Sequence, residues 1–322
     1  MLAPMEGVTD PAFREVMLEL HSPEALGGAF TEFVVVSRNE PVPTRVLRRH
    51  LGRSDFKTPV GMQLMGPNPD TMAETARRVE SLGVVPVLDI NFGCPAKGAL
   101  KSCAGSAALR DPRSMEALVR RITDVVSTIP VTAKIRAGFD NADHVEELAR
   151  AVEQGGAAML TIHCRTRAEK YQEQVYWERI GRAVDAISIP VCGNGSIQTH
   201  ADLERMRRET GCRYAMVGRG ALANPWVFSG EVADESQSFE FLCRYVDAMR
   251  ATGPGVARGL ANRVKQLVRY WTAGDTFTET RTAWLRDPDP DHFLERLFRE
   301  REVRAARISA RSTNSSALSA DS

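Results

Sequence analysis

Short apolar runs alternate with amphipathic segments along the first 228 residues. The runs lie near residues 2–5, 30–36, 59–65, 86–92, 131–136, 157–163, 190–194 and 213–218, and their length and composition predict strands. Segments such as 69–82, 112–126, 143–153 and 199–209 carry apolar residues three and four positions apart, which predicts helices. Eight strands, most of them followed by a helix, favour a (β/α)₈ TIM barrel over a doubly wound sheet. We therefore predict a barrel over residues 1–233.

From about Asp234 the pattern becomes purely helical. Helices are predicted at 239–251, 258–272, 276–286 and 291–308, separated by Gly-Pro-Gly at 253–255 and Asp-Pro-Asp-Pro at 287–290. This pattern predicts a small helical bundle over residues 234–308, after the barrel. Residues 309–322 are polar and rich in Ser, so we expect a disordered tail there.

The predicted helix over 258–272 has two distinct faces. At about 100° per residue, its apolar residues fall within one arc, which predicts a face buried in the bundle. On the other side lies a group of cations that we call the basic stripe: Arg258, Lys265 and Arg269.

The composition agrees with a soluble enzyme and gives no sign of a metal site. The chain has 322 residues and 43% apolar residues, enough for one large domain and a small one. Its six cysteines form no CxxC pair and no cluster with zinc-ligand spacing, so we expect no metal site and reduced thiols. No apolar run approaches the ~20 residues of a membrane span, and the first strand begins close to Met1. We therefore expect a cytoplasmic protein with neither a membrane segment nor a signal peptide.

The net charge of +1 conceals an uneven distribution. Residues 1–240 carry 28 Lys and Arg against 31 Asp and Glu, whereas residues 241–311 carry 14 against 9. The C-terminal part is therefore the basic part. Of the 42 basic residues 36 are Arg, which suits phosphate recognition, although a GC-rich genome would also explain the excess.

Polar or Gly-rich motifs close most of the apolar runs. They include residues 2–7, 63–66, 89–95, 134–136, 162–165, 193–195 and 217–220. Because catalytic groups of a TIM barrel gather at the carboxyl ends of its strands, these motifs predict one site at that end. The absence of GxGxxG at the start of a βαβ unit argues against a permanent dinucleotide site.

Two residue types in these motifs suggest chemistry by themselves. Cys94 follows a buried strand, and a thiol with an ordinary pKa of about 8.5 keeps its proton at neutral pH and can act as a proton donor. Structural packing is the alternative for a strand-end cysteine. Lys134 lies within an apolar run and needs a negative partner, either a cofactor or an acidic neighbour such as Asp89.

The loops at Asn194-Gly195 and at Gly218-Arg219 occupy the two positions where barrels commonly bind a phosphate. Glycines let backbone N–H groups approach an oxyanion, and Arg219 can neutralise it. Glycines at strand ends also occur in simple turns, so both interpretations remain open.

In their order and spacing, these motifs resemble those of the flavin-dependent tRNA-dihydrouridine synthases, most closely the bacterial C-type branch. The resemblance implies a monomeric FMN enzyme that uses NADPH to reduce a flipped-out uridine of tRNA, with hydride going to C6 and a proton from Cys94 to C5. It also implies the residues that hold the flavin: Pro4, Met5, Glu6, Gln63, Lys134, His163, Asn194, Gly195, Ser196, Gly218 and Arg219. His163 is expected to bind flavin or uracil rather than transfer a proton.

The same resemblance suggests where the RNA binds. Asn91, with a donor and an acceptor, suits the edge of the uracil base. Arg136, Arg165 and the basic stripe are expected to contact RNA phosphates, with ordinary surface charge as the alternative. The second domain would then be a tRNA-binding domain.

The choice of uridine is less well defined by the sequence. The C-type branch has an arginine in its Thr-Glu-Phe-Val region, where this chain has Val35. Residues 262–266 approximate the branch's Arg-Ile-Lys-Gln motif, which favours position 16 of the D-loop. An FMN barrel that reduces a free pyrimidine-like molecule is the alternative function, but it leaves the basic bundle without a role.

Overall fold

The computed structural model describes residues 1–101, 103–170, 172, 174–253 and 256–319. Its centre is a parallel eight-stranded sheet that confirms the predicted TIM-type α/β fold. Seven strands follow one another around the sheet: β1 (Ala29–Phe30), β3 (Val60–Met65), β4 (Leu88–Phe92), β5 (Val131–Arg136), β6 (Met159–His163), β7 (Val191–Asn194) and β8 (Tyr214–Met216). The remaining strand, β2 (Val34–Val35), pairs with β3.

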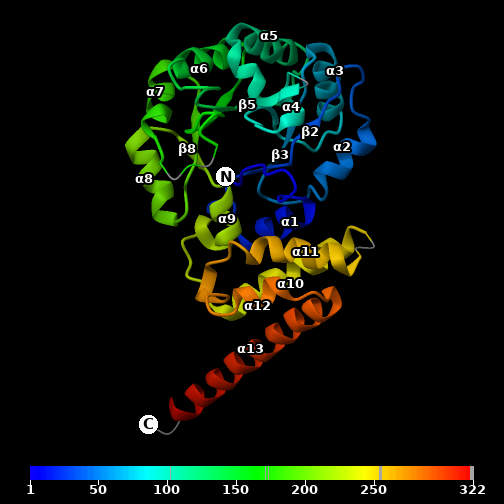
Figure 1. The fold of residues 1–322 in the computed structure, drawn as a ribbon, viewed down its shortest axis with the longest axis vertical. Helices are drawn as coiled ribbons and strands as arrows, with labels where there is room; N and C mark the ends of the chain where they lie inside the picture. The colour runs from blue at the N-terminus through cyan, green and yellow to red at the C-terminus, as the bar shows by residue number, and fades with distance from the viewer. Residues whose placement is uncertain (102, 171, 173, 254–255, 320–322) are drawn as a thin grey trace.

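The first predicted strand is much shorter than the sequence indicates. Only Leu2 pairs, through parallel bridges to Ala29 on one side and to Val217 on the other. The Leu2 N–H donates to the Gly28 carbonyl at 2.9 Å, and the Ala3 N–H donates to the Val217 carbonyl at 2.8 Å. Pro4 has no N–H and cannot continue the ladder. Leu2 thus connects the two edges of the sheet, and the strands form the ring seen in Figure 1.

Helices cover the outside of this ring (Figure 1). The predicted segments 69–82, 112–126, 143–153 and 199–209 correspond to α3 (Pro69–Glu80), α5 (Pro112–Thr123), α6 (Val145–Gln154) and α8 (His200–Thr210). Side-chain caps from Asn68, Asp111 and Thr199 start three of them, two with Pro at the first position. The other helices of this part are α1 (Pro11–Leu20), α2 (Thr44–Leu51), α4 (Lys97–Lys101), α7 (Glu178–Ala186) and α9 (Arg219–Ala223), with 3₁₀-helices at Gly105–Arg110 and Pro225–Phe228.

A second group of helices packs against α1 at one side of the barrel (Figure 1). It consists of α10 (Glu235–Ala251), α11 (Ala257–Val268), α12 (Arg281–Arg286) and α13 (Pro290–Ser319), with a 3₁₀-helix at Ala273–Asp275. Aromatic side chains join the two parts, since Phe13 of α1 lies 5.7 Å from Tyr245 and 6.1 Å from Phe241 of α10. Each such edge-to-face pair contributes about 0.5–1.5 kcal/mol beyond its burial. This contact fixes the helical group to the barrel.

The C-terminal segment differs from the prediction. Where the sequence suggested a disordered tail from residue 309, α13 continues through Ser319. Residues 291–319 contain neither Gly nor Pro, so no residue interrupts the helix after Pro290. The last three residues, 320–322, lie outside the described residues.

The described part of the chain contains no helix that is both long enough and apolar enough to cross a membrane. Nor does any group of three or more His, Cys, Asp or Glu side chains there have an arrangement that could hold a metal ion.

Candidate active site

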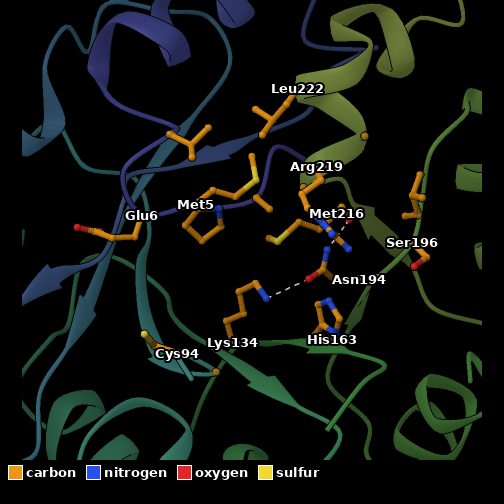
Figure 2. A pocket seen from close by; sticks show the side chains of 18 of the residues that line it. Met5, Glu6, Cys94, Lys134, His163, Asn194, Ser196, Met216, Arg219 and Leu222 are labelled. Atoms are coloured by element: carbon orange, nitrogen blue, oxygen red, sulfur yellow. Dashed lines mark hydrogen bonds between the residues drawn. The ribbon is translucent and has the colours of Figure 1, made fainter. Parts of the chain in front are cut away.

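A cavity of about 420 Å³ opens at the carboxyl ends of the strands, between the barrel and α11. Figure 2 shows side chains from opposite sides of the ring converging on it. Most of the residues singled out in the sequence line this cavity: Pro4, Met5, Glu6, Asn91, Cys94, Lys134, Arg136, His163, Asn194, Gly195, Ser196, Gly218 and Arg219. The motifs at the strand ends therefore do form one site, of a size typical for a small-molecule ligand.

Lys134 extends from β5 toward β7. Its ammonium donates to Asn194 Oδ1 at 3.1 Å, and Asn194 Nδ2 donates to the Met216 carbonyl at 2.7 Å (Figure 2). Asp89, the acidic neighbour considered from the sequence, instead accepts hydrogen bonds from Gln63 and Thr132. Burial, with the positive charge of Arg136, lowers the pKa of Lys134 to about 8. At neutral pH Lys134 thus remains mostly protonated and offers its remaining N–H donors to the cavity.

The two glycine loops are tightly packed. Gly195 has φ +128°, and a Cβ there would lie 2.5 Å from Cys164 Sγ. At Gly220 a Cβ would lie 2.3 Å from the Ile197 carbonyl oxygen. Trp177 Nε1 donates to the Gly195 carbonyl at 2.9 Å, which holds the first loop in place. Gly195 is required by its positive φ and by the Cys164 side chain, and Gly220 by the neighbouring backbone at Ile197, so the loops are more than simple turns.

His163 is held as a neutral ring. Its Nδ1 accepts the Arg165 backbone N–H at 3.1 Å, which leaves the proton on Nε2. Burial, followed by the charges of Lys134 and Arg136, lowers the pKa of His163 well below its ordinary value. The imidazole can therefore donate a hydrogen bond from Nε2, as a binding residue does.

Cys94 lies at the cavity wall with 9% of its surface exposed. Burial raises the pKa of the Cys94 thiol, and the nearby Glu6 carboxylate raises it further. The thiol therefore keeps its proton at neutral pH, as a proton donor requires. Figure 2 shows Cys94 and Glu6 on one side of the cavity, opposite Asn194 and Arg219.

Asn91 differs from its expected role. Its Oδ1 already accepts the backbone N–H groups of Gly93 and Cys94, both at 2.9 Å, and its Nδ2 donates to Gln63 Oε1 at 2.7 Å. The acceptor expected to read a base edge is therefore occupied by the backbone at Cys94. One N–H of the Asn91 amide remains for a ligand.

Gln63 and Arg165 do not line the cavity. Gln63 is fully buried and lies behind the cavity lining, where its amide joins Asp89 to Asn91. Arg165 is 2% exposed and donates to Ser196 Oγ at 2.7 Å, so it supports the glycine loop. Arg136 lines the cavity with 4% of its surface exposed, and its Nε donates to the Gly93 carbonyl at 2.8 Å. The contact of Arg136 with RNA stays a prediction.

The basic stripe is only partly a surface feature. Lys265 is half-buried, donates to the Asp287 carbonyl and lies 5.0 Å from the Phe293 ring, so part of its charge is already directed at the bundle. Arg258 and Arg269 are exposed, away from the cavity lining.

Sequence reasoning missed the face of α11 that reaches the site. Gln266, together with Tyr270 just after the helix, lines the cavity. The sequence shows that they are four residues apart and so share one side of the helix. Only the packing of the helical bundle on the barrel shows that this side faces the cavity.

Comparison with known proteins identifies the family of this chain. A sequence model of the family described as Dihydrouridine synthase (Dus) matches residues 1–272. The tRNA-dihydrouridine(16) synthase of Pseudomonas syringae pv. tomato is 37% identical over 231 residues, covering 70% of this chain and 71% of the relative. The enzyme of the same name from Salmonella typhimurium is 38% identical over 233 residues, covering 70% and 73%. Histamine dehydrogenase from Rhizobium sp. 4-9 shares the fold, with a TM-score of 0.51 at 12% identity over 77% of this chain and 48% of that one. The chain belongs to the dihydrouridine synthase family.

Proposed function

We propose that this protein, acting as a monomer, reduces the uridine at position 16 of the tRNA D-loop to 5,6-dihydrouridine, with bound FMN and with NADPH as the reductant. The observation that carries the proposal is the placement of Cys94 and Lys134 in one cavity. Cys94 follows β4, and Lys134 lies in the neighbouring strand β5. The thiol retains its proton, and the lysine retains most of its charge.

The residues present fit FMN. The glycine loops at Gly195 and Gly218, with Arg219, form a corner of backbone N–H groups and positive charge suited to a phosphate. Behind it, Nε and Nη1 of Arg165 are buried and have no hydrogen-bond partner among the described residues, so a positively charged group with two unused donors supports the same corner. Lys134 and His163 offer N–H donors in the centre of the cavity.

When bound, FMN would supply the hydride chemistry, accepting a hydride from NADPH and passing it to C6 of the uracil. The protein's own contribution is to hold charges and one proton in place. Lys134 presents positive charge where negative charge develops. Cys94 donates its proton to C5, a role that typically contributes about 10²–10⁴-fold to the rate. A base within folded RNA cannot reach this cavity, so the uridine must flip out of its stack.

The choice of position 16 rests on the names of the relatives and on the resemblance of residues 262–266 to the C-type motif. Val35, where that branch has an arginine, is 62% exposed on β2, and its side chain cannot form a polar contact with RNA. Contacts of the tRNA with other residues, including those of α11, must then orient it.

The test uses the purified protein, FMN, NADPH and unmodified tRNA transcripts. Mass spectrometry of nuclease fragments should show dihydrouridine at position 16, and a transcript with cytidine at that position should remain unmodified. Modification at another uridine would contradict the assignment of the position. Reduction of free uracil or uridine without modification of tRNA would support the alternative function instead.

A further inference from the structure

Beneath the cavity, three buried polar side chains lie at the same level of neighbouring strands. Gln63 of β3 pairs in register with Asp89 of β4, and Asp89 pairs with Thr132 of β5. Thr132 Oγ1 donates to one carboxylate oxygen of Asp89, and Gln63 Nε2 donates to the other, both at 2.6 Å. Asp89 is 2% exposed and Gln63 is fully buried.

The hydrogen bonds continue upward to Cys94. Gln63 Oε1 accepts from Asn91 Nδ2 at 2.7 Å, and Asn91 Oδ1 accepts the N–H groups of Gly93 and Cys94 at 2.9 Å. A single path of hydrogen bonds therefore runs from a buried carboxylate to the backbone of the proposed proton donor.

The two ends of this path fix its direction, because the backbone N–H groups at Gly93 and Cys94 only donate and the carboxylate at Asp89 accepts. An ionised carboxylate only accepts hydrogen bonds, whereas an amide fits its space equally well when it is turned by 180°. Burial raises the pKa of Asp89 to about 6, while the hydrogen bonds from Thr132 and Gln63 oppose this shift. Asp89 is thus ionised at neutral pH, and Gln63 must present its N–H to it.

Without an acceptor at position 89, the buried N–H of Gln63 would lose its partner. If Gln63 turned its amide by 180°, its N–H would face the N–H of Asn91. If Asn91 turned as well, its N–H would face the backbone N–H groups of Gly93 and Cys94. Each arrangement leaves a buried donor unsatisfied, which costs about 1–3 kcal/mol, so the loop would be held less firmly.

We propose that Asp89 is a positioning residue that fixes the orientation of the Gln63 and Asn91 amides and thereby holds the backbone at Cys94. The proposal rests on the proposed function for the chemical role of Cys94, but not for its geometry. It explains why an Asp is buried five residues before the thiol with no cation hydrogen-bonded to it among the described residues.

The test compares Asp89→Leu with Asp89→Asn, and it uses Gln63→Met as a second variant that breaks the path. Leu fills a similar space but has no acceptor, so the Gln63 N–H loses its partner. Asn can keep its Oδ1 toward Gln63 and donate its N–H to Thr132 Oγ1, because a hydroxyl accepts as well as donates. Asp89→Asn is therefore the matched control for loss of the carboxylate charge. Met at position 63 removes the acceptor of the Asn91 N–H.

The readout is alkylation of Cys94 by iodoacetamide at neutral pH, followed by mass spectrometry in a Cys103→Ala background. Cys103 is exposed, whereas the other four cysteines are buried. Asp89→Leu and Gln63→Met should each accelerate alkylation about tenfold or more, the factor that corresponds to about 1.4 kcal/mol, the order of one lost hydrogen bond. Asp89→Asn should keep the rate within about threefold of the parent, on the same scale.

An unchanged rate in folded Asp89→Leu overturns the proposal. So does an Asp89→Asn variant that is as reactive as Asp89→Leu, since loss of the charge alone would then explain the effect. If Asp89→Leu does not fold, an unchanged rate in Gln63→Met overturns the proposal. Dihydrouridine formation is measured in parallel. If the parent forms none, the proposed function fails, while the alkylation rates still decide the role of Asp89.

Discussion

The glycine at position 195 permits a sharp test of the phosphate corner, because the structure defines the cost of a side chain there. In Gly195→Ala the added Cβ lies 2.5 Å from Cys164 Sγ, closer than side-chain atoms can approach. Cys164 is fully buried, and its N–H is bonded to the Asn194 carbonyl at 2.9 Å, so it cannot easily move away. We expect the loop at residue 195 to shift instead.

Two terms determine the magnitude. Overpacking of a buried site costs about 1–3 kcal/mol, and a non-glycine residue at φ +128° costs about 1–3 kcal/mol more. If the loop relieves even about 2 kcal/mol of this strain by moving away from the ligand, FMN affinity falls about 30-fold. Gly195→Ala should therefore bind FMN at least that much more weakly than the parent.

The assay is titration of the apoprotein with FMN, monitored by the quenching of flavin fluorescence. Cys164→Ala added to Gly195→Ala removes the overpacking but not the backbone strain, and it should recover part of the affinity. Gly211→Ala is the matched control, since Gly211 has φ +72° and its nearest atom is Val184 Cγ1 at 3.6 Å, outside the cavity. It should lower stability without weakening FMN binding. Parent-like FMN affinity in Gly195→Ala would refute the reasoning.

Three further predictions concern the thiol, the cations and the aromatic residue of the site. Cys94→Ala should still bind FMN and oxidise NADPH but lose at least ~10² in dihydrouridine formation, whereas Cys103→Ala should cost little; the reverse result would make Cys103 the donor. Arg258→Glu with Arg269→Glu should weaken tRNA binding and lower the slope of log K against log salt by about two contacts, near 0.9 or less for each, and an unchanged slope would place the RNA elsewhere. Tyr270, 44% exposed at the cavity, is positioned to stack on a base. Tyr270→Ala should lower kcat/KM for tRNA about 5- to 150-fold, the equivalent of ~1–3 kcal/mol, with Tyr270→Phe close to the parent; equal activity of both variants would exclude stacking.

Much of the site could be predicted from the sequence, because in this fold a residue's position along its strand determines where it lies in space. Parallel strands bring their carboxyl ends to one rim, so residues that end different strands meet there. Cys94, Lys134, His163 and Asn194 follow this rule, and all four line the cavity. Local periodicity also predicted the barrel helices, whose caps and Pro residues lie within or next to the segments themselves.

Errors arose where a residue's role depends on partners that are distant in the sequence. Gln63 lies near the end of β3 and Arg165 just after β6, yet both are buried, because Asp89 and Ser196 accept their hydrogen bonds. Lys265 was assigned to a surface stripe by helical angle alone, but it is half-buried and donates to the Asp287 carbonyl. The pattern of a single strand or helix does not show which residue of another element will accept a side chain's hydrogen bond.

The sequence by itself therefore determined the type of fold, the rim at which the chemistry lies and the identity of its thiol and lysine. Those properties depend on the spacing of apolar residues and on the residue types at the end of each strand. Only the tertiary structure decided which amide oxygen faces Cys94, that Leu2 alone connects the edges of the sheet, and that Gln266 and Tyr270 of the helical part reach the cavity. Hydrogen bonds and packing across elements set these features, since each depends on the position of atoms dozens of residues away in the chain.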